Sequence, residues 1–137
     1  MVPQVLAEFI QNSPGLFRDN VQISNAQIQV VNNGLQLSGR VNSNGREVGI
    51  ENMRLIITAD GQIAVEGRPD MNFDSLNALQ QRVAPGMMNR IIRTFGDRIN
   101  SGINMRIPQQ WEVQGYQIHD EKLVMRMGRR QSRRQAA

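Results

Sequence analysis

Cysteine is absent from this chain of 137 residues, and histidine, lysine, tryptophan and tyrosine occur once each. The absence of cysteine excludes disulfides, thiolate catalysis and zinc sites with cysteine ligands. The single histidine, His119, cannot form a histidine metal cluster by itself. The longest aliphatic run, Leu55 to Ile57, is far shorter than the roughly 20 apolar residues of a membrane span, and the first residues lack the pattern of a signal peptide. These absences leave the compartment undetermined, with attachment to a membrane surface as one option.

Sequence patterns that carry catalysis or nucleotide binding are missing as well. The glycines form neither GxGxxG nor GxxxxGKS/T, so no nucleotide fingerprint is present. His119 stands beside Asp120 and Glu121, but without a nucleophile motif a polar turn is a better interpretation than a general base. Asp70 and Asp74 could bind calcium only with the rest of an EF-hand loop, which is absent. We therefore expect no enzyme activity, no cofactor and no metal, and a binding surface instead.

Turn signals of one kind recur three times between Asn20 and Gly67. Asn-Gly and Asp-Gly pairs are favoured where both central residues of a tight hairpin take positive φ. Alternating apolar and polar residues flank all three pairs, which are Asn33-Gly34, Asn44-Gly45 and Asp60-Gly61. The sequence therefore predicts an antiparallel meander of four strands. Breaks in the alternation near Asn25-Ala26 and near Asn52 are typical of β-bulges.

The period of the apolar residues changes from two to about 3.6 after the meander, which indicates a helix. We expect a helical region from Ser75 to Asn100, with Asp74 or Ser75 as its N-cap. Pro85-Gly86 in its middle indicates either one kinked helix or two helices in tandem.

Apolar residues on this helix cover more of its circumference than packing on one sheet requires. From Val83 to Ile99 they span an arc of roughly 180°, whereas a stripe of about 100° is usual for a helix on a core. The surplus predicts contact with a lipid chain or a second subunit, and the simpler interpretation is an ordinary core. The residues predicted to line an apolar groove for an acyl chain are Met87, Met88, Ile91, Ile92 and Phe95.

Positive charge is almost entirely arginine, and much of it lies at the end of the chain. Arg82, Arg90 and Arg93 fall on the polar side of the long helix, where a solvated face is a better interpretation than a phosphate site. Residues 129–137 are predicted to form a disordered basic tail. The arginines of this tail that could meet an anionic membrane surface, or less favourably nucleic-acid phosphates, are Arg129, Arg130, Arg133 and Arg134.

Five segments of the chain resemble the C-terminal half of the LmeA-like family, a bacterial group. The segments are VLAEFI, IQVVNNGLQLSGRV, MRLIITADGQIAVEG, LNALQQRVAPGMMNRIIRTF and IPQQWEVQGYQIHDEKLVMRM. The resemblance extends from Val5 to Met127. It implies a fold like that of the tubular lipid-binding (TULIP) proteins, in which a long helix lies within a highly curved antiparallel sheet. It also implies binding of phospholipid or another acyl-chain ligand without catalysis.

The predicted fold class is α+β, with a curved antiparallel meander wrapped on a long amphipathic helix, as in one half of a TULIP domain. A short helix over Pro3–Gln11 and a closing strand pair around His119 complete a single domain, residues 1–128. The expected function is non-enzymatic binding of a phospholipid or other acyl chain in the groove, at a membrane surface or within a homodimer. Two alternatives remain: an assembly subunit that uses the same apolar face, and an anionic-surface or nucleic-acid binder that uses the arginine tail.

Overall fold

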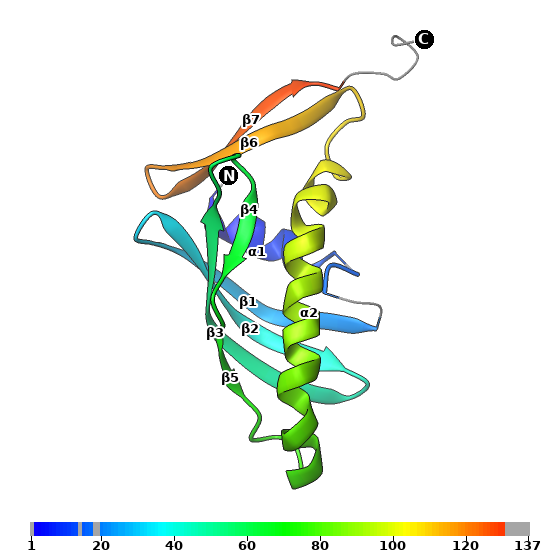
Figure 1. Cartoon of the computed structure of the whole chain (residues 1–137). Coiled ribbons are helices and arrows are strands. Elements are labelled where there is room, and N and C mark those ends of the chain that lie inside the picture. Colours follow the sequence, from blue (N-terminus) through cyan, green and yellow to red (C-terminus); the bar gives the residue numbers. More distant parts are fainter. Residues whose placement is uncertain (1, 14, 18–19, 131–137) are drawn as a thin grey trace.

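The computed structural model describes residues 2–13, 15–17 and 20–130 and shows an α+β fold (Figure 1). The meander strands and one additional short strand form a five-stranded antiparallel sheet, and two further strands form a second sheet. In chain order the described elements are α1 (Pro3–Gln11), β1 (Val21–Val31), β2 (Gly34–Ser43), β3 (Arg46–Ile57), β4 (Ile63–Glu66), β5 (Asp70–Asn72), α2 (Ala78–Asn104), β6 (Trp111–His119) and β7 (Lys122–Arg129).

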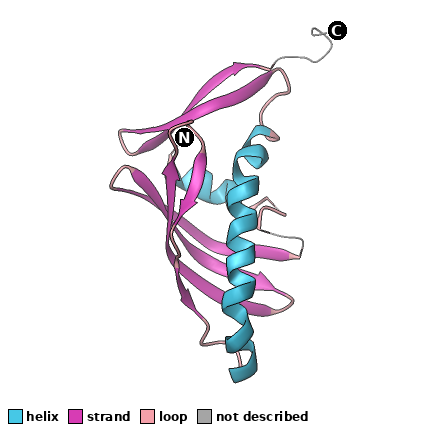
Figure 2. Cartoon of the chain, viewed as in Figure 1, coloured by secondary structure: helices cyan, strands magenta, loops and turns pink. Residues whose placement is uncertain are grey.

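The long helix α2 runs along the five-stranded sheet, and its C-terminal end reaches the two-stranded sheet (Figure 2). It contacts β4 of the first sheet and β6 of the second, while α1 packs against β1. The predicted fold class, an antiparallel meander packed with a long amphipathic helix and closed by a strand pair, is therefore confirmed.

The first two hairpin turns follow the predicted chemistry, with one shift in position. Asn44 and Gly45 have φ values of 53° and 79°, as a type I′ turn requires. The first turn consists of Asn32 and Asn33, with φ values of 49° and 59°, because Gly34 already pairs within β2. The prediction of Asn33-Gly34 as the turn pair was wrong by one residue, since asparagine also tolerates positive φ.

The third turn is longer than the predicted two-residue type. The backbone N–H of Thr58 donates to the carbonyl of Gln62, and that of Gly61 donates to the carbonyl of Thr58. Gly61 takes a φ of 78°, whereas Asp60 is not among the residues with positive φ. The loop is thus a β-turn followed by a left-handed glycine, a common hairpin connection.

Both predicted β-bulges are confirmed, at residues with left-handed backbone. Asn25, with a φ of 53°, lies where the β1–β2 register shifts, and Asn52, with a φ of 58°, lies where the β2–β3 register shifts. The Asn52 side chain also donates to the Asp70 carboxylate at 2.8 Å. This bond links the bulge to β5, a three-residue strand that pairs with β3 and that the sequence pattern did not predict.

The long helix begins and ends later than predicted. Asn77 is its N-cap, because its side chain accepts from the N–H of Gln80 while the Gln80 side chain accepts from the N–H of Asn77. The predicted cap Ser75 instead donates from its hydroxyl to the carbonyl of Glu47 at 2.6 Å. Pro85 lies within one continuous helix, so of the two predicted alternatives the tandem pair of helices is wrong.

The helix continues past the predicted end at Asn100 to Asn104. A side chain at Gly102 would place its Cβ 2.7 Å from Cδ2 of Leu16, so the glycine permits a close approach of the buried Leu16 to the helix. The core beside this contact contains the stacked rings of Phe17 and Phe95, with centroids 4.6 Å apart.

Candidate functional site

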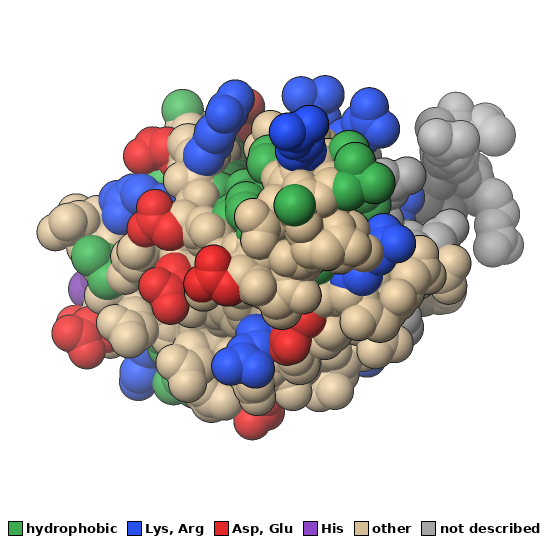
Figure 3. Space-filling model, turned by 90° about the horizontal axis from the view of Figure 1, so that it is seen from below, with side chains coloured by type: hydrophobic (Ala, Val, Ile, Leu, Met, Phe, Trp, Pro, Cys, Tyr) green, Lys and Arg blue, Asp and Glu red, His purple; other side chains and the backbone are tan. Residues whose placement is uncertain are grey.

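The N-terminal half of α2 carries a strip of exposed apolar side chains. Leu79, Val83 and Met87 are 72%, 52% and 40% exposed. They recur every four residues, so they lie along one line of the helix. Seen from the end where α2 begins, hydrophobic side chains lie beside Lys and Arg side chains on the surface (Figure 3). We call these three residues the α2 strip.

A small apolar cavity opens beside the α2 strip, between α2 and the β2–β3 hairpin. Its volume is about 60 Å³, which is small compared with an acyl chain. Most of its lining is aliphatic, and Arg46 at the start of β3 is its charged residue. The lining residues are Val41, Ser43, Asn44, Arg46, Val48, Leu76, Gln80, Val83, Ala84, Met87, Met88 and Ile91.

Three of the five predicted groove residues meet at this cavity. Met87 lines its outer side, and Met88 and Ile91, which are 3% and 2% exposed, line its inner side. Ile92 lies instead on a separate cleft on the other side of α2, and Phe95 is fully buried against Phe17. The five residues therefore do not line one groove, because Ile92 faces a different cleft and Phe95 is part of the core.

The sequence of α2 predicts the α2 strip only in part. Leu79 and Val83 belong to the apolar series of the helix, yet spacing alone does not distinguish them from the buried positions. In the structure Leu79, Val83 and Met87 are exposed, whereas Met88 and Ile91 are buried. This difference is set by tertiary packing, which the helix sequence does not encode.

The segment of α2 that carries the α2 strip contains only positive charge. Between Asp74 and Asp97 the chain contains no acidic residue. Arg82, Arg90 and Arg93 are exposed, as the solvated-face interpretation predicted, and their side chains make no ion pair within the described part of the chain. An anionic group near the strip would meet no repulsion from this stretch of helix.

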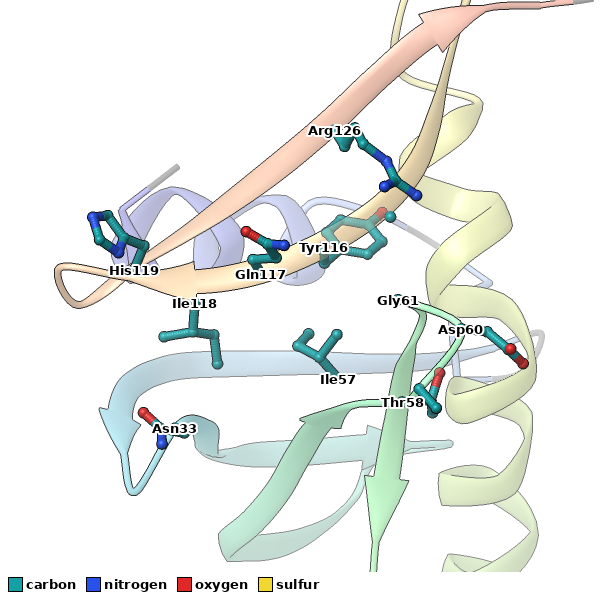
Figure 4. Close-up of a pocket in the computed structure, with 12 residues that line it drawn as sticks. Asn33, Ile57, Thr58, Asp60, Gly61, Tyr116, Gln117, Ile118, His119 and Arg126 are labelled. Atoms are coloured by element: carbon teal, nitrogen blue, oxygen red, sulfur yellow. The ribbon is translucent and has the colours of Figure 1, made fainter.

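A second cleft, of about 500 Å³, separates the β6–β7 hairpin from the β3–β4 turn (Figure 4). Ile57 and Ile118 contribute aliphatic surface to it, and polar groups surround them. Figure 4 shows Arg126 and Asp60 toward one end of the cleft and His119 toward the other. The polar lining residues include Asn33, Thr58, Asp60, Gln117, His119 and Arg126.

Three titratable residues that line this cleft, Asp60, His119 and Arg126, are exposed. His119 lies 3.3 Å from Asp120, but both side chains are largely exposed, as expected for a polar turn. No group of three or more histidine or acidic side chains that could hold a metal ion occurs in the described part of the chain. Tyr116 also lines this cleft, and burial raises the pKa of its hydroxyl to about 12.

The arginines predicted for a basic tail divide into two groups. Arg129 is the last residue of β7, and the backbone N–H of Arg130 donates to the carbonyl of Gln110 at 2.9 Å. The predicted start of a disordered tail at residue 129 was therefore wrong, because β7 extends through it. Arg133 and Arg134 lie outside the described residues.

Within the described residues, no helix has the length and apolar character needed to cross a membrane. Comparison with protein-family models, with curated proteins and with solved structures finds no match to this chain.

Proposed function

We propose that this chain is a non-enzymatic binding domain that holds an acyl chain, as in a phospholipid, along the α2 strip. The observation that carries the proposal is the exposure of Leu79, Val83 and Met87 beside an apolar cavity, in a stretch whose only charges are positive. Large apolar residues that are adjacent and exposed mark a binding surface more often than an unused one.

The size of the cavity determines how an acyl chain would lie. A space of about 60 Å³ accommodates only the end of a chain, so the remaining methylenes would cover the α2 strip from outside. Each methylene removed from water contributes about 0.8 kcal/mol. Several methylenes on Val83 and Met87 would therefore be needed for measurable affinity.

The arginines near the cavity favour an anionic headgroup on the ligand. Arg46 lines the cavity itself, and Arg90 lies almost one turn beyond Met87 on α2. Guanidinium groups match the oxygens of phosphate and carboxylate. The resemblance of the sequence to the LmeA-like family supports the same class of ligand.

Binding of a fluorescent long-chain fatty acid to the purified chain tests this proposal. Val83→Glu places a charge in the α2 strip and should abolish probe binding while the chain stays folded, because Val83 is half exposed. Val124→Glu on β7 is the matched control, since Val124 is 44% exposed and lies outside the cavity lining. It should bind the probe as the parent does.

Two results would remove the proposal. The first is absence of probe binding by the parent chain, and the second is equal binding by Val83→Glu and the parent. If the parent instead elutes as a dimer and Val83→Glu as a monomer, without probe binding in either, the α2 strip is an assembly face.

A further inference from the structure

The open end of the β6–β7 hairpin, opposite its turn, presents a second exposed apolar surface. One face of the hairpin is buried in part, and Val113 and Leu123 on this face are both buried. Toward the open end of the strands, Trp111 and Met127 on this face are 43% and 39% exposed. Val113 pairs with Met127, and Trp111 is two residues from Val113, so both side chains project from the same side of the sheet.

Basic side chains border these two residues. Arg129 is the direct cross-strand partner of Trp111. Arg130 follows it, and its guanidinium donates to the carbonyl of Asn104 at 3.4 Å, which places it at the last turn of α2. Neither arginine makes an ion pair within the described residues. We call Trp111, Met127, Arg129 and Arg130 the tryptophan face.

We infer that the tryptophan face docks the domain on an anionic phospholipid bilayer. Tryptophan favours the boundary between acyl chains and headgroups, because its ring is apolar and its N–H is a donor. The flexible Met127 adds apolar surface that adapts to a disordered partner. Unpaired arginines near a surface of anionic lipid contribute up to ~1 kcal/mol each.

Other partners fit the tryptophan face less well. A second copy of the chain would bring Arg129 and Arg130 toward their equivalents, so like charges would oppose self-association. A single-stranded nucleic acid is bound by several stacked aromatic side chains along a basic groove, and Trp111 is the only tryptophan in the chain.

The tryptophan face and the α2 strip are separate surfaces at opposite ends of α2 (Figure 1). A helix of 27 residues has a length of about 40 Å, so one surface is remote from the other. Docking at the tryptophan face therefore does not depend on the acyl-chain proposal, and each can fail while the other holds.

Trp111 makes the experiment direct, because all tryptophan fluorescence of the full chain comes from this residue. The chain is titrated with vesicles of phosphatidylcholine alone and of phosphatidylcholine mixed with phosphatidylglycerol, each with and without brominated acyl chains. We expect a blue shift, and quenching by bromine, with the anionic vesicles only. Raising the salt concentration should weaken both effects, since the attraction is electrostatic at the surface.

Paired arginine variants separate local contact from overall charge. Arg129→Gln with Arg130→Gln should weaken vesicle affinity about fivefold for each arginine removed. Arg68→Gln with Arg93→Gln removes the same charge at the cleft between β4 and α2 and should leave the Trp111 signal unchanged. All four side chains are exposed, and thermal unfolding of each variant checks that it folds.

Three outcomes would overturn the inference. They are no binding to anionic vesicles, binding without quenching of Trp111, and equal loss of affinity in both paired variants. The second would mean that another part of the chain meets the bilayer, and the third that only net charge matters.

Discussion

At the scale of single residues, Tyr116 is the most constrained polar group that the structure describes. Its hydroxyl is buried and has no hydrogen-bond partner within the described part of the chain. Its backbone N–H, by contrast, donates to the carbonyl of Gly61 at 2.7 Å and joins β6 to the β3–β4 turn. The strand that carries this buried hydroxyl is thus held in place through its backbone.

Ionisation of Tyr116 should destabilise the fold at alkaline pH. Burial raises the pKa of this side chain from 10.0 to about 12. Between these values the unfolded chain has lost the phenolic proton and the folded chain has kept it, so the free energy of unfolding falls as pH rises. Below pH 10.0 the contribution is fully present. Because the chain has one tyrosine, the ultraviolet absorbance of phenolate measures this titration directly.

Tyr116→Phe is the control for this titration. In this variant the free energy of unfolding should not fall with pH in the range where the tyrosine titrates. At neutral pH the variant should be at least as stable as the parent, since removing an unsatisfied hydroxyl carries little cost. A folded parent chain whose tyrosine titrates at the ordinary pKa would contradict the burial of the hydroxyl.

Substitution by glutamate should destabilise the fold strongly at one of two adjacent methionines and only slightly at the other. Met88 is 3% exposed, so Met88→Glu buries an unpaired charge and should cost roughly 3–5 kcal/mol of stability. Met87 is 40% exposed, and Met87→Glu should change stability by about 0.5 kcal/mol or less while removing acyl-probe binding. Chemical denaturation and probe titration measure the two effects. Similar destabilisation by both substitutions would show that Met87 is a core residue.

At the scale of elements, the start of α2 depends on one reciprocal pair of hydrogen bonds. Asn77→Ala removes the side chain that caps the helix and should lower the free energy of unfolding by about 0.5–2 kcal/mol. Asp74→Ala is the matched control, because Asp74 was a predicted cap and its carboxylate caps no helix in the structure. Urea denaturation compares the two, and a larger loss in Asp74→Ala would place the cap where the sequence predicted it.

Apart from β5, the order and type of the elements could be predicted, because each of the others has a local signal. The turn at Asn44-Gly45 and the bulge at Asn25 follow from residues that tolerate positive φ. Boundaries were less predictable where several residues carry the same signal, as at Asn32, Asn33 and Gly34. β5 could not be predicted, since it pairs with β3 and is linked to the distant Asn52 through Asp70, and no local pattern indicates these contacts.

The candidate site was predictable only in outline. The excess of apolar residues on the helix is visible in the sequence, and three of them, Met87, Met88 and Ile91, line one cavity. Which side chains stay exposed depends on tertiary packing, and Phe95 is fully buried where Phe17 stacks on it. That contact joins residues far apart in the sequence, so no local pattern indicates it.

At the scale of the whole molecule, few polar contacts join the two-stranded sheet to the rest of the domain. Truncation after Gly128 removes Arg129 and Arg130, including the bond from Arg130 to Asn104, whereas truncation after Arg130 retains both residues. We expect the shorter chain to unfold at a temperature a few degrees lower than the longer one. In a domain of this size, loss of a contact worth about 1 kcal/mol lowers the unfolding midpoint by a few degrees. Equal midpoints in a thermal scan would show that these contacts do not stabilise the fold.

The measurement that most directly tests acyl-chain binding is native mass spectrometry of the chain after incubation with a phospholipid extract. We expect the mass of one phospholipid on the parent chain and on Val124→Glu, and its loss from Val83→Glu. A parent chain that carries no lipid, or a Val83→Glu chain that carries as much as the parent, would show that the α2 strip does not bind an acyl chain.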